Sequence, residues 1–354
     1  MNKLLSFYKK KKVLVTGSTG FKGSWLCFWL HLLKCDTVGI ALRPEKGSIL
    51  FKKLKIKKKI KQYFLNIENY KKLNEVIKKE KPDLIIHLAA QSIVSLSYKY
   101  PQKTIKTNII GSLNILEVAK ENNIGNLIYI TSDKCYLNKD NKKIYIESDR
   151  LGGEDLYSAS KASAEIIFEA YQKSFLKINK TIKFASARAG NVIGGGDMKK
   201  DRIVPDIMKS LINKTKLEIR SPKAVRPWQH VLEPLYGYLI LGNYLIKNKL
   251  KKNIQPNWNF GPNIKNIKSV KEIVLKSLKY WNIKKKFILK KNKNFREVNF
   301  LMLNSKKANK EIKWKPKLNF NDTIRLTVEW YKSYHNKENL EKITKKQIEF
   351  FLKK

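Results

Sequence analysis

The feature that most constrains this fold is a set of three glycines, spaced three apart, between a strand-like and a helix-like segment. Residues 13–16 are Val, Leu, Val and Thr, which predict a buried strand, and the apolar residues of 25–32 recur at helical spacing. Gly17, Gly20 and Gly23 allow a sharp backbone turn and close packing of the helix on the strand. The free N–H groups and positive dipole end of such a helix attract a pyrophosphate. We therefore predict a strand, a tight turn and a helix that bind a diphosphate-containing ligand.

The chain has 354 residues, with 75 Lys and Arg against 29 Asp and Glu, and a formal net charge of +46. A charge of this size raises nucleic acid or an anionic membrane as a partner. However, only eight of the basic residues are arginine, and the lysines are spread along the chain. Nucleic-acid readers cluster their charge and use arginine for bidentate contacts. We therefore expect a dispersed lysine surface, and a basic nucleic-acid-binding protein is the remote alternative.

The three cysteines, Cys27, Cys35 and Cys135, are odd in number and lack metal-ligand spacing, which predicts a reducing compartment and no metal site. No apolar run reaches the roughly 18 residues that span a bilayer. The first twelve residues place their charge after a short apolar patch, the reverse of a signal peptide. These features predict a cytoplasmic protein without a membrane partner.

Apolar, β-branched runs alternate with helical patterns through the first half of the chain. Strands are predicted at 37–42, 63–67, 84–91 and 127–131. Such alternation implies right-handed crossovers and an α/β fold with a doubly wound parallel sheet of Rossmann type. The second half departs from this pattern, which predicts a smaller, mixed C-terminal substrate-binding lobe. The expected divisions are 10–187 for the dinucleotide-binding domain, 188–335 for the lobe, interleaved with the core, and 336–354 for a helical tail.

Tyr157 and Lys161 are four residues apart at the start of a predicted helix and so share one of its faces. An ammonium near a phenol favours the phenolate, which would lower the pKa of Tyr157 from about 10 toward neutrality. A tyrosine so tuned can act as a base. We therefore expect Tyr157 and Lys161 to be catalytic.

Polar side chains follow the strand predicted at 127–131. Ser132, Asp133 and Lys134 come directly after it, and the carboxyl ends of strands are where open α/β sheets bind ligands. His87 lies inside another predicted strand, so we expect it to be a core residue.

Three of the eight arginines, Arg188, Arg202 and Arg226, lie in irregular segments of the second half. Because this chain otherwise uses lysine, arginine at these places suggests a need for planar guanidinium geometry, as for a diphosphate or a carboxylate. Random scatter of so few residues is the alternative.

Several motifs resemble the nucleotide-sugar 4,6-dehydratases of the extended short-chain dehydrogenase/reductase superfamily. The motifs are the glycine turn, His87–Gln91, Ser132–Tyr136, Tyr157 with Lys161, Arg188–Asp197, Arg226–Pro234 and Trp258–Pro262, and the resemblance runs from about residue 10 to the C-terminal tail. Within that family, relatives acting on dTDP-glucose or GDP-mannose carry Asp-Glu where this chain has Asp133-Lys134. That pair and the long segment from Arg226 are similar to the branch that acts on CDP-glucose.

The resemblance implies an NAD-dependent lyase that converts CDP-D-glucose to CDP-4-dehydro-6-deoxy-D-glucose and water, in deoxysugar and lipopolysaccharide O-antigen biosynthesis. It implies that Tyr157 takes the 4-hydroxyl proton as hydride leaves C4. The resulting ketone acidifies the C5 proton, the 6-hydroxyl leaves as water with Asp133 as the acid, and hydride returns to C6. Ser132 would bind the sugar oxygen at C4, and Lys161 the nicotinamide ribose. Lys134 would be the C5 base or a positioning group.

The resemblance also implies the binding residues. The expected cofactor contacts are Gly17, Thr19, Gly20, Phe21, Lys22, Gly23, Arg43, Asn66, Ile67, Leu88, Ala89, Ala90, Tyr157 and Lys161. The expected substrate contacts are Gln91, Asn191, Arg202, Arg226, His230 and Glu297. Arg43 stands where an acid usually holds the adenosine ribose, so NADP stays open beside NAD. Asn66 replaces the usual Asp near adenine and can still accept a hydrogen bond.

A homodimer, or a higher homo-oligomer, is expected through the helices near 107–120 and 158–175, which resemble an intersubunit four-helix bundle. The alternatives left open are other extended enzymes of the superfamily that act on a nucleotide sugar. These are a dehydratase for dTDP-glucose or GDP-mannose, or an epimerase, which would not release water.

Overall fold

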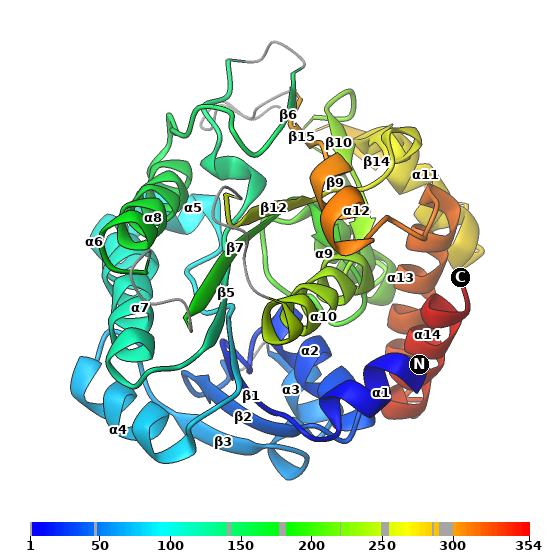
Figure 1. Ribbon diagram of the computed structural model, residues 1–354. Coiled ribbons are helices and arrows are strands. Elements are labelled where there is room, and N and C mark those ends of the chain that lie inside the picture. Colours follow the sequence, from blue (N-terminus) through cyan, green and yellow to red (C-terminus); the bar gives the residue numbers. More distant parts are fainter. Residues whose placement is uncertain are drawn as a thin grey trace.

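A seven-stranded sheet forms the centre of the molecule (Figure 1). This computed structural model describes residues 2–45, 48–139, 143–176, 182–219, 221–248, 255–284, 287–289 and 300–354. The strands lie in the order β12-β7-β5-β4-β1-β2-β3, and every neighbouring pair is parallel. They are β1 (Lys12–Thr16), β2 (Asp36–Ala41), β3 (Lys61–Phe64), β4 (Leu84–His87), β5 (Asn126–Ile130), β7 (Lys183–Ala189) and β12 (Asn257–Phe260). The predicted doubly wound α/β fold is confirmed.

The chain order reverses at the centre of the sheet, between β1 and β4. From β1 the chain first builds outward through β2 and β3, and then returns to place β4 on the other side of β1. In open α/β sheets the crevice beyond the carboxyl ends of strands at such a switch point is where ligands bind. The glycine turn that follows β1 therefore lies at the point where a ligand is expected.

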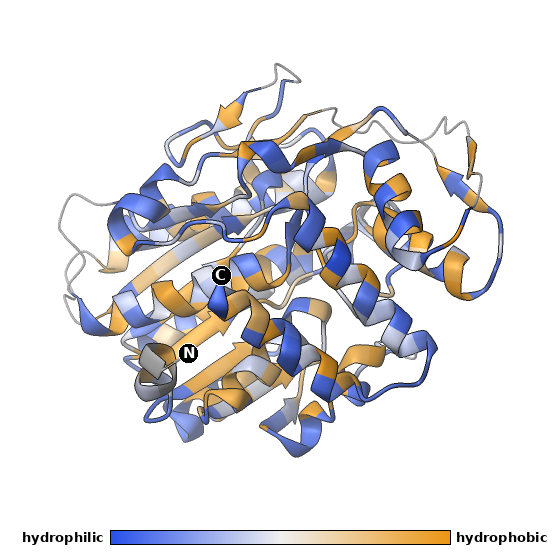
Figure 2. Cartoon of the chain, turned by 90° about the vertical axis from the view of Figure 1, so that its right-hand side faces the viewer, coloured by the Kyte–Doolittle hydropathy of each residue, from blue (hydrophilic) through white to orange (hydrophobic). Residues whose placement is uncertain are grey.

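Helices cover both faces of the sheet (Figure 1). One face packs against α4 (Tyr70–Glu80), α7 (Gly111–Glu121) and α8 (Leu156–Tyr171). The other packs against α2 (Phe21–Leu32) and α10 (Leu232–Lys247), with α1 (Asn2–Tyr8) and α14 (Leu340–Lys353) outside them. Because both faces are buried, the strands are apolar almost throughout, as parallel strands are. Figure 2 shows hydrophobic residues on the strands and the inner sides of the helices.

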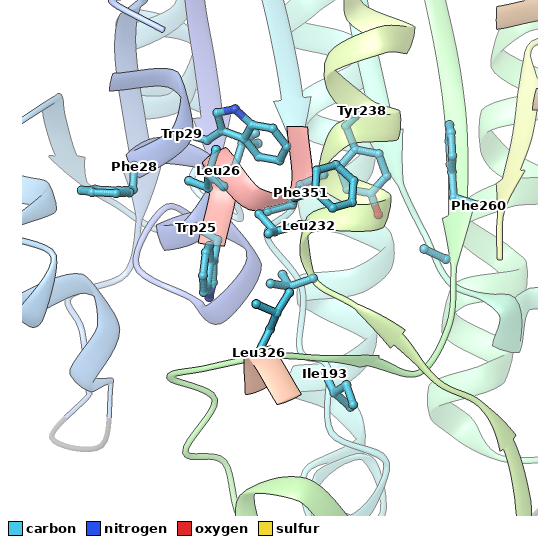
Figure 3. Packing of buried hydrophobic residues seen from close by; sticks show 14 of the residues in the cluster. Trp25, Leu26, Phe28, Trp29, Ile193, Leu232, Tyr238, Phe260, Leu326 and Phe351 are labelled. Carbon is cyan, nitrogen blue, oxygen red and sulfur yellow. The ribbon is translucent and has the colours of Figure 1, made fainter. Parts of the chain in front are cut away.

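The core between α2, α10 and α14 is rich in aromatic side chains (Figure 3). Trp25 and Trp29 of α2 are fully buried, and the Trp29 and Phe351 rings lie edge to face with centroids 5.9 Å apart. Burying an aromatic side chain of this size contributes about 2–3 kcal/mol. This packing holds the helix that follows the glycine turn firmly against the sheet.

A lobe of short elements lies beside the central sheet, and all of its short strands except β6 come from the second half of the chain. The two-stranded pairs are β6 (Ile144–Tyr145) with β15 (Met302–Leu303), β8 (Val192–Ile193) with β11 (Gln229–His230), β9 (Leu217–Ile219) with β14 (Phe287–Leu289), and β10 (Val225–Pro227) with β13 (Ile267–Ser269). The helices are α9 (Ile203–Ile212), α11 (Val270–Trp281), α12 (Lys306–Ile312) and α13 (Phe320–His335). The boundary proposed at residue 187 falls inside β7, and β12 adds a strand from the second half to the central sheet. The division into domains stays a prediction.

The remaining elements are short. They are α3 (Ile49–Lys53), α5 (Val94–Lys99), α6 (Pro101–Ile105), the 3₁₀ helices η1 (Ile56–Lys58), η3 (Asp133–Cys135) and η5 (Ile264–Asn266), and the π-helices η2 (Lys106–Ile110) and η4 (Gln172–Leu176). Among the described residues, no helix is long and apolar enough to span a membrane, and no group of His, Cys, Asp or Glu could hold a metal ion.

Candidate active site

The glycine turn has the shape of a diphosphate cradle. Gly17 adopts a left-handed φ of 72°, and its N–H donates to the carbonyl of Ile40 at 2.7 Å. A Cβ on Gly23 would lie 2.1 Å from the carbonyl oxygen of Gly17, so only glycine lets α2 pack this close. A Cβ on Gly20 would instead meet only that carbonyl, at 3.3 Å, and point into open space. The start of α2 is thus open to a ligand, which fits the pyrophosphate of a dinucleotide.

His87 is a core residue, as expected. Its Nδ1 lies 2.7 Å from Oγ1 of Thr16 and its Nε2 lies 3.0 Å from Oγ of Ser112, and burial lowers the pKa of His87 to about 3. The N–H groups of Leu88 and Ala89 both donate to the same Thr16 hydroxyl. This draws the chain out of the strand, so β4 ends at His87 and the expected strand to residue 91 is wrong.

The residues predicted to contact the cofactor beyond the glycine turn lie at the carboxyl ends of the neighbouring strands. Thr19 donates through Oγ1 to the carbonyl of Leu42 at 3.1 Å, just past β2. The guanidinium of Arg43 is exposed and lies over the ring of Phe64, 5.1 Å from its centroid. Asn66 is exposed and accepts the N–H of Glu68 through Oδ1, whereas Ile67 is buried. Leu88, Ala89 and Ala90 are half-buried after β4, where the backbone of Ala89 contacts Gly17.

Ser132 and Asp133 form a buried pair directly after β5. The Ser132 hydroxyl donates to Oδ1 of Asp133 at 2.8 Å, and the carboxyl is 3% exposed. A Cβ on Gly190 would lie 1.8 Å from Oδ2 of Asp133, so the bare glycine makes room for the carboxyl. Burial raises the pKa of Asp133, although the ammonium groups of Lys134 and Lys22 oppose the rise. Burial therefore shifts Asp133 toward its protonated form, the form in which a carboxyl can serve as an acid.

Tyr157 and Lys161 share a face of α8 and are 7% and 5% exposed. Burial raises the pKa of Tyr157 to about 12, and the guanidinium of Arg202 is the strongest opposing charge. The expected lowering of this pKa by Lys161 is therefore wrong for the protein alone, because desolvation of the phenolate dominates. Burial also lowers the pKa of Lys161 to about 8, and burial with the charge of Arg202 lowers that of Lys22 to about 8.

His230, expected to contact the substrate, lies in β11 and is enclosed by the protein. It is fully buried, its ring lies edge to face with Trp25 at a centroid distance of 6.0 Å, and its Nδ1 accepts the N–H of Leu232. Its Nε2 is buried and has no hydrogen-bond partner among the described residues, and the substrate contact expected for His230 stays a prediction. Burial lowers the pKa of His230 to about 3, which keeps the ring neutral.

Arg202 links the second half to the loop after β4. Its Nη1 donates to Oδ2 of Asp197 at 2.7 Å, and its Nη2 donates to the hydroxyl of Ser92 at 3.0 Å. Gln91 begins the same loop, and its side-chain amide is bonded to both the N–H and the carbonyl of Ile93. The substrate roles of Arg202 and Gln91 stay predictions.

Three further residues are expected to contact the substrate: Asn191, Arg226 and Glu297. Asn191 follows Gly190 with a left-handed φ of 35°. Arg226, in β10, is half-buried and donates through Nη1 to the carbonyl of Val225 at 2.9 Å. Glu297 lies outside the described residues.

Asn108 is a site residue that the sequence reasoning missed. It is fully buried in the π-helix η2, its Oδ1 accepts the N–H of Gln91, and its Nδ2 donates to Oγ of Ser160 at 3.0 Å. Ser160 in turn donates to the carbonyl of Tyr157. Asn108 thus connects the loop after β4 with the helix of Tyr157. The π-helix that holds Asn108 is of a kind often found at functional sites, but it is seen only in the structure, and no local sequence pattern indicates it.

The diphosphate cradle, the buried Ser132–Asp133 pair and the Tyr157–Lys161 face together define the class of this protein, the extended short-chain dehydrogenase/reductases. A family model described as GDP-mannose 4,6 dehydratase matches residues 14–327, and the chain belongs to this family.

Two curated relatives are 4,6-dehydratases that act on nucleotide sugars. CDP-glucose 4,6-dehydratase of Salmonella typhimurium is 37% identical over 352 residues, which cover 98% of both chains. dTDP-D-glucose 4,6-dehydratase of Dictyostelium discoideum is 30% identical over 59% of this chain and 50% of that protein.

Solved structures share the fold. UDP-glucose 4-epimerase of Thermotoga maritima superposes with a TM-score of 0.77 at 20% identity, covering 91% of this chain and 99% of that chain. dTDP-glucose 4,6-dehydratase of Bacillus anthracis, solved with NAD, gives a TM-score of 0.74 at 22% identity, covering 94% and 99%.

Proposed function

We propose that this chain is an NAD-dependent CDP-glucose 4,6-dehydratase, a hydro-lyase that forms CDP-4-dehydro-6-deoxy-D-glucose and water. The identity of 37% to the Salmonella enzyme over 98% of both chains supports this substrate. The observation that carries the proposal is the buried Ser132–Asp133 pair, with Lys134 beside it and Tyr157 on the facing helix. A buried carboxyl with a raised pKa suits the acid of an elimination, whereas an epimerase needs no acid at a leaving hydroxyl.

The oxidation at C4 would use residues of α8 and η3. When bound, NAD supplies the hydride acceptor for C4 and the hydride donor for C6. Tyr157 would take the proton of the 4-hydroxyl as the phenolate, a form that burial disfavours in the protein alone and that the positive charge of oxidised NAD would favour. The hydroxyl of Ser132 would bind the oxygen at C4. Both side chains are at least nine-tenths buried, so bulk water is kept away from the reacting atoms.

The loss of water would use Asp133 and Lys134. A ketone at C4 acidifies the C5 proton, and Asp133 gives its proton to the departing 6-hydroxyl. Burial raises the pKa of Asp133, which shifts the carboxyl toward the protonated form that this step needs. Lys134 is half-buried next to it and either removes the C5 proton or positions the sugar.

NAD is the cofactor that this cradle would hold, with Gly17, Gly20 and Gly23 at the pyrophosphate. Structures that share the fold hold NAD. Residues Leu88–Ala90 are half-buried and pack against Gly17, and they would contact the rest of the dinucleotide. Arg43, stacked on Phe64 at the ribose end, is exposed, so binding of NADP is to be compared directly with binding of NAD.

Binding of the CDP moiety is assigned to Asn191, Arg202 and Arg226. Gln91, His230 and Glu297 are the other proposed substrate contacts. Arg202 is close enough to Tyr157 for its charge to oppose the rise in the pKa of that phenol, which supports a place for Arg202 beside the reacting groups. An arginine pairs well with a diphosphate because its planar fork can donate two hydrogen bonds. The enzyme would act in the cytoplasm as a homodimer or higher homo-oligomer and feed deoxysugar synthesis for lipopolysaccharide O-antigen.

The test is to incubate the purified chain and NAD with CDP-glucose, dTDP-glucose, UDP-glucose and GDP-mannose in turn. The molecular mass of each product is then measured by mass spectrometry. We expect CDP-glucose to lose one water and the others to react slowly or not at all. Water loss only from dTDP-glucose or GDP-mannose would reassign the nucleotide. An isomer of unchanged mass would indicate an epimerase.

A further inference from the structure

A buried ion pair lies behind the active site and takes no part in the proposed chemistry. Glu165 of α8 and Arg188 of β7 meet with Nη2 and Oε2 2.8 Å apart, and their side chains are 1% and 2% exposed. Removing two charges from water costs several kcal/mol per ion, which only good geometry and further hydrogen bonds repay. The further partners of this pair show what it holds.

The ion pair holds both ends of the segment that carries the proposed acid. At one end, the hydroxyl of Thr131 donates to Oε1 of Glu165. At the other, Nη1 of Arg188 donates to the hydroxyl of Tyr136 at 2.7 Å, and the guanidinium lies 5.0 Å from the centroid of that ring. Thr131 and Tyr136 are the residues immediately before and after residues 132–135. One ion pair therefore brackets Ser132, Asp133 and Lys134.

The surrounding groups fix the ion pair itself. The hydroxyl of Ser186 donates to Oε2 of Glu165 at 2.9 Å, and Nη1 of Arg188 also donates to the carbonyl of Glu147 at 3.0 Å. The hydroxyl of Tyr136 in turn donates a hydrogen bond to Oδ1 of Asn259 on β12, at 2.9 Å. These contacts tie α8, β5, β7 and β12 to one point, so the pair cannot shift without moving the bracketed segment.

We propose that Glu165 and Arg188 are positioning residues, which fix both ends of segment 131–136 so that Ser132 and Asp133 meet the sugar in a single geometry. Neither side chain touches the proposed substrate. A buried ion pair with no task beyond filling space can often be replaced by apolar residues of similar volume without loss. The proposal predicts that here such a replacement loses order in the segment. Its kinetic part rests on the proposed function, and its structural part does not.

The structural test compares amide hydrogen exchange in the full-length protein with NAD present. The double variant Glu165→Leu with Arg188→Met removes both charges and leaves no buried ion unpaired. We expect amides of 131–136 to exchange about tenfold faster or more, while those of 84–87 in β4 are unchanged. The matched control is Glu169→Gln on the exposed face of α8, where the carboxylate pairs only with Lys173 at 2.8 Å. Unchanged exchange at 131–136, or an equal rise throughout the sheet, would overturn the proposal.

The kinetic test uses Glu165→Gln and the same double variant with CDP-glucose. Loss of a fixed geometry should lower kcat by about tenfold to a hundredfold. The KM for CDP-glucose should change less than about threefold, because the nucleotide contacts are elsewhere. A rise in KM with unchanged kcat would contradict a positioning role. If the chain turns over no CDP-glucose at all, the proposed function fails, and the exchange experiment still decides the role of the pair.

Discussion

At the scale of single residues, burial more than neighbouring charge sets the protonation of the acid and base. Burial raises the pKa of Asp133 although Lys134 and Lys22 oppose it, and burial raises the pKa of Tyr157 although Arg202 opposes it. Burial likewise lowers the pKa values of Lys22 and Lys161 to about 8. The site thus holds its ionisable groups closer to neutral than their spacing in the sequence indicates.

The role of Asp133 can be tested at this scale with Asp133→Asn, which keeps the shape and removes the acidic proton. We expect C4 oxidation to proceed and loss of water to slow by about a hundredfold or more, since general acid catalysis contributes on that order. The expected sign is a build-up of reduced nicotinamide absorbance after CDP-glucose is added. Normal product release by this variant would remove Asp133 from the reaction.

At the scale of elements, Glu233 in the first turn of α10 joins that helix to the segment before α13. Its Oε1 accepts the N–H groups of Lys317 and Leu318, while its Oε2 has no partner among the described residues. Burial raises the pKa of Glu233 to about 7 from an ordinary value near 4.5. A carboxyl with a raised pKa contributes stability at low pH, and this is lost as the pH rises through about 7.

We therefore expect Glu233→Gln, which keeps the accepting oxygen, to remove part of the pH dependence of stability. Between about pH 5 and about pH 8, the free energy of unfolding of the natural protein should fall by up to about 3 kcal/mol relative to the variant. Urea unfolding at several pH values measures this difference. Parallel curves for the two proteins would show that Glu233 does not titrate in this range.

The antiparallel pair β10–β13 presents Arg226, for which a contact with the CDP moiety is predicted. An arginine bonded to a charged group contributes about 1.5–3 kcal/mol, so Arg226→Ala should weaken CDP-glucose binding by roughly 10- to 150-fold. Affinity for the dinucleotide should not change. Calorimetry that finds unaltered CDP affinity, or a weaker dinucleotide complex, would place Arg226 outside the substrate site.

The parts of the fold and site that could be predicted from the sequence are those that depend on residues close together in the chain. Gly17, Gly20 and Gly23 shape a single turn, and each run of apolar residues predicts a buried strand by itself. The π-helix around Asn108 and the fully buried His230 depend instead on contacts with distant segments, so no local pattern indicates them. Arg188 shows the same limit: its guanidinium meets a carboxylate, as the chemistry predicts, but the carboxylate is Glu165 of the same chain.

At the scale of the whole molecule, apolar side chains exposed on η2, α8 and η4 mark the expected subunit contact. Ile110, Ile166 and Phe175 are 47%, 53% and 49% exposed. Large apolar residues gathered on helices that already cover the sheet are typical of a surface that a second copy buries.

We therefore expect a homodimer at micromolar concentration, and expect Ile166→Lys to shift it toward monomer by placing a charge in the contact. Analytical ultracentrifugation measures both. The matched control is Leu275→Lys on α11. Leu275 is 49% exposed, close to the 53% of Ile166, and it lies in the lobe built by the second half of the chain. A natural protein that sediments only as a monomer would contradict the assembly.

The central claim is a redox-neutral dehydration, in which the hydrogen removed from C4 returns to C6 of the same sugar. The most direct test is to convert CDP-glucose carrying deuterium at C4 in ordinary water and to locate the label in the product. The account predicts deuterium at C6 of a 4-keto-6-deoxy sugar, with ordinary hydrogen from water at C5. Deuterium found at C4 of a hexose that keeps its 6-hydroxyl, or deuterium lost to water, would contradict it.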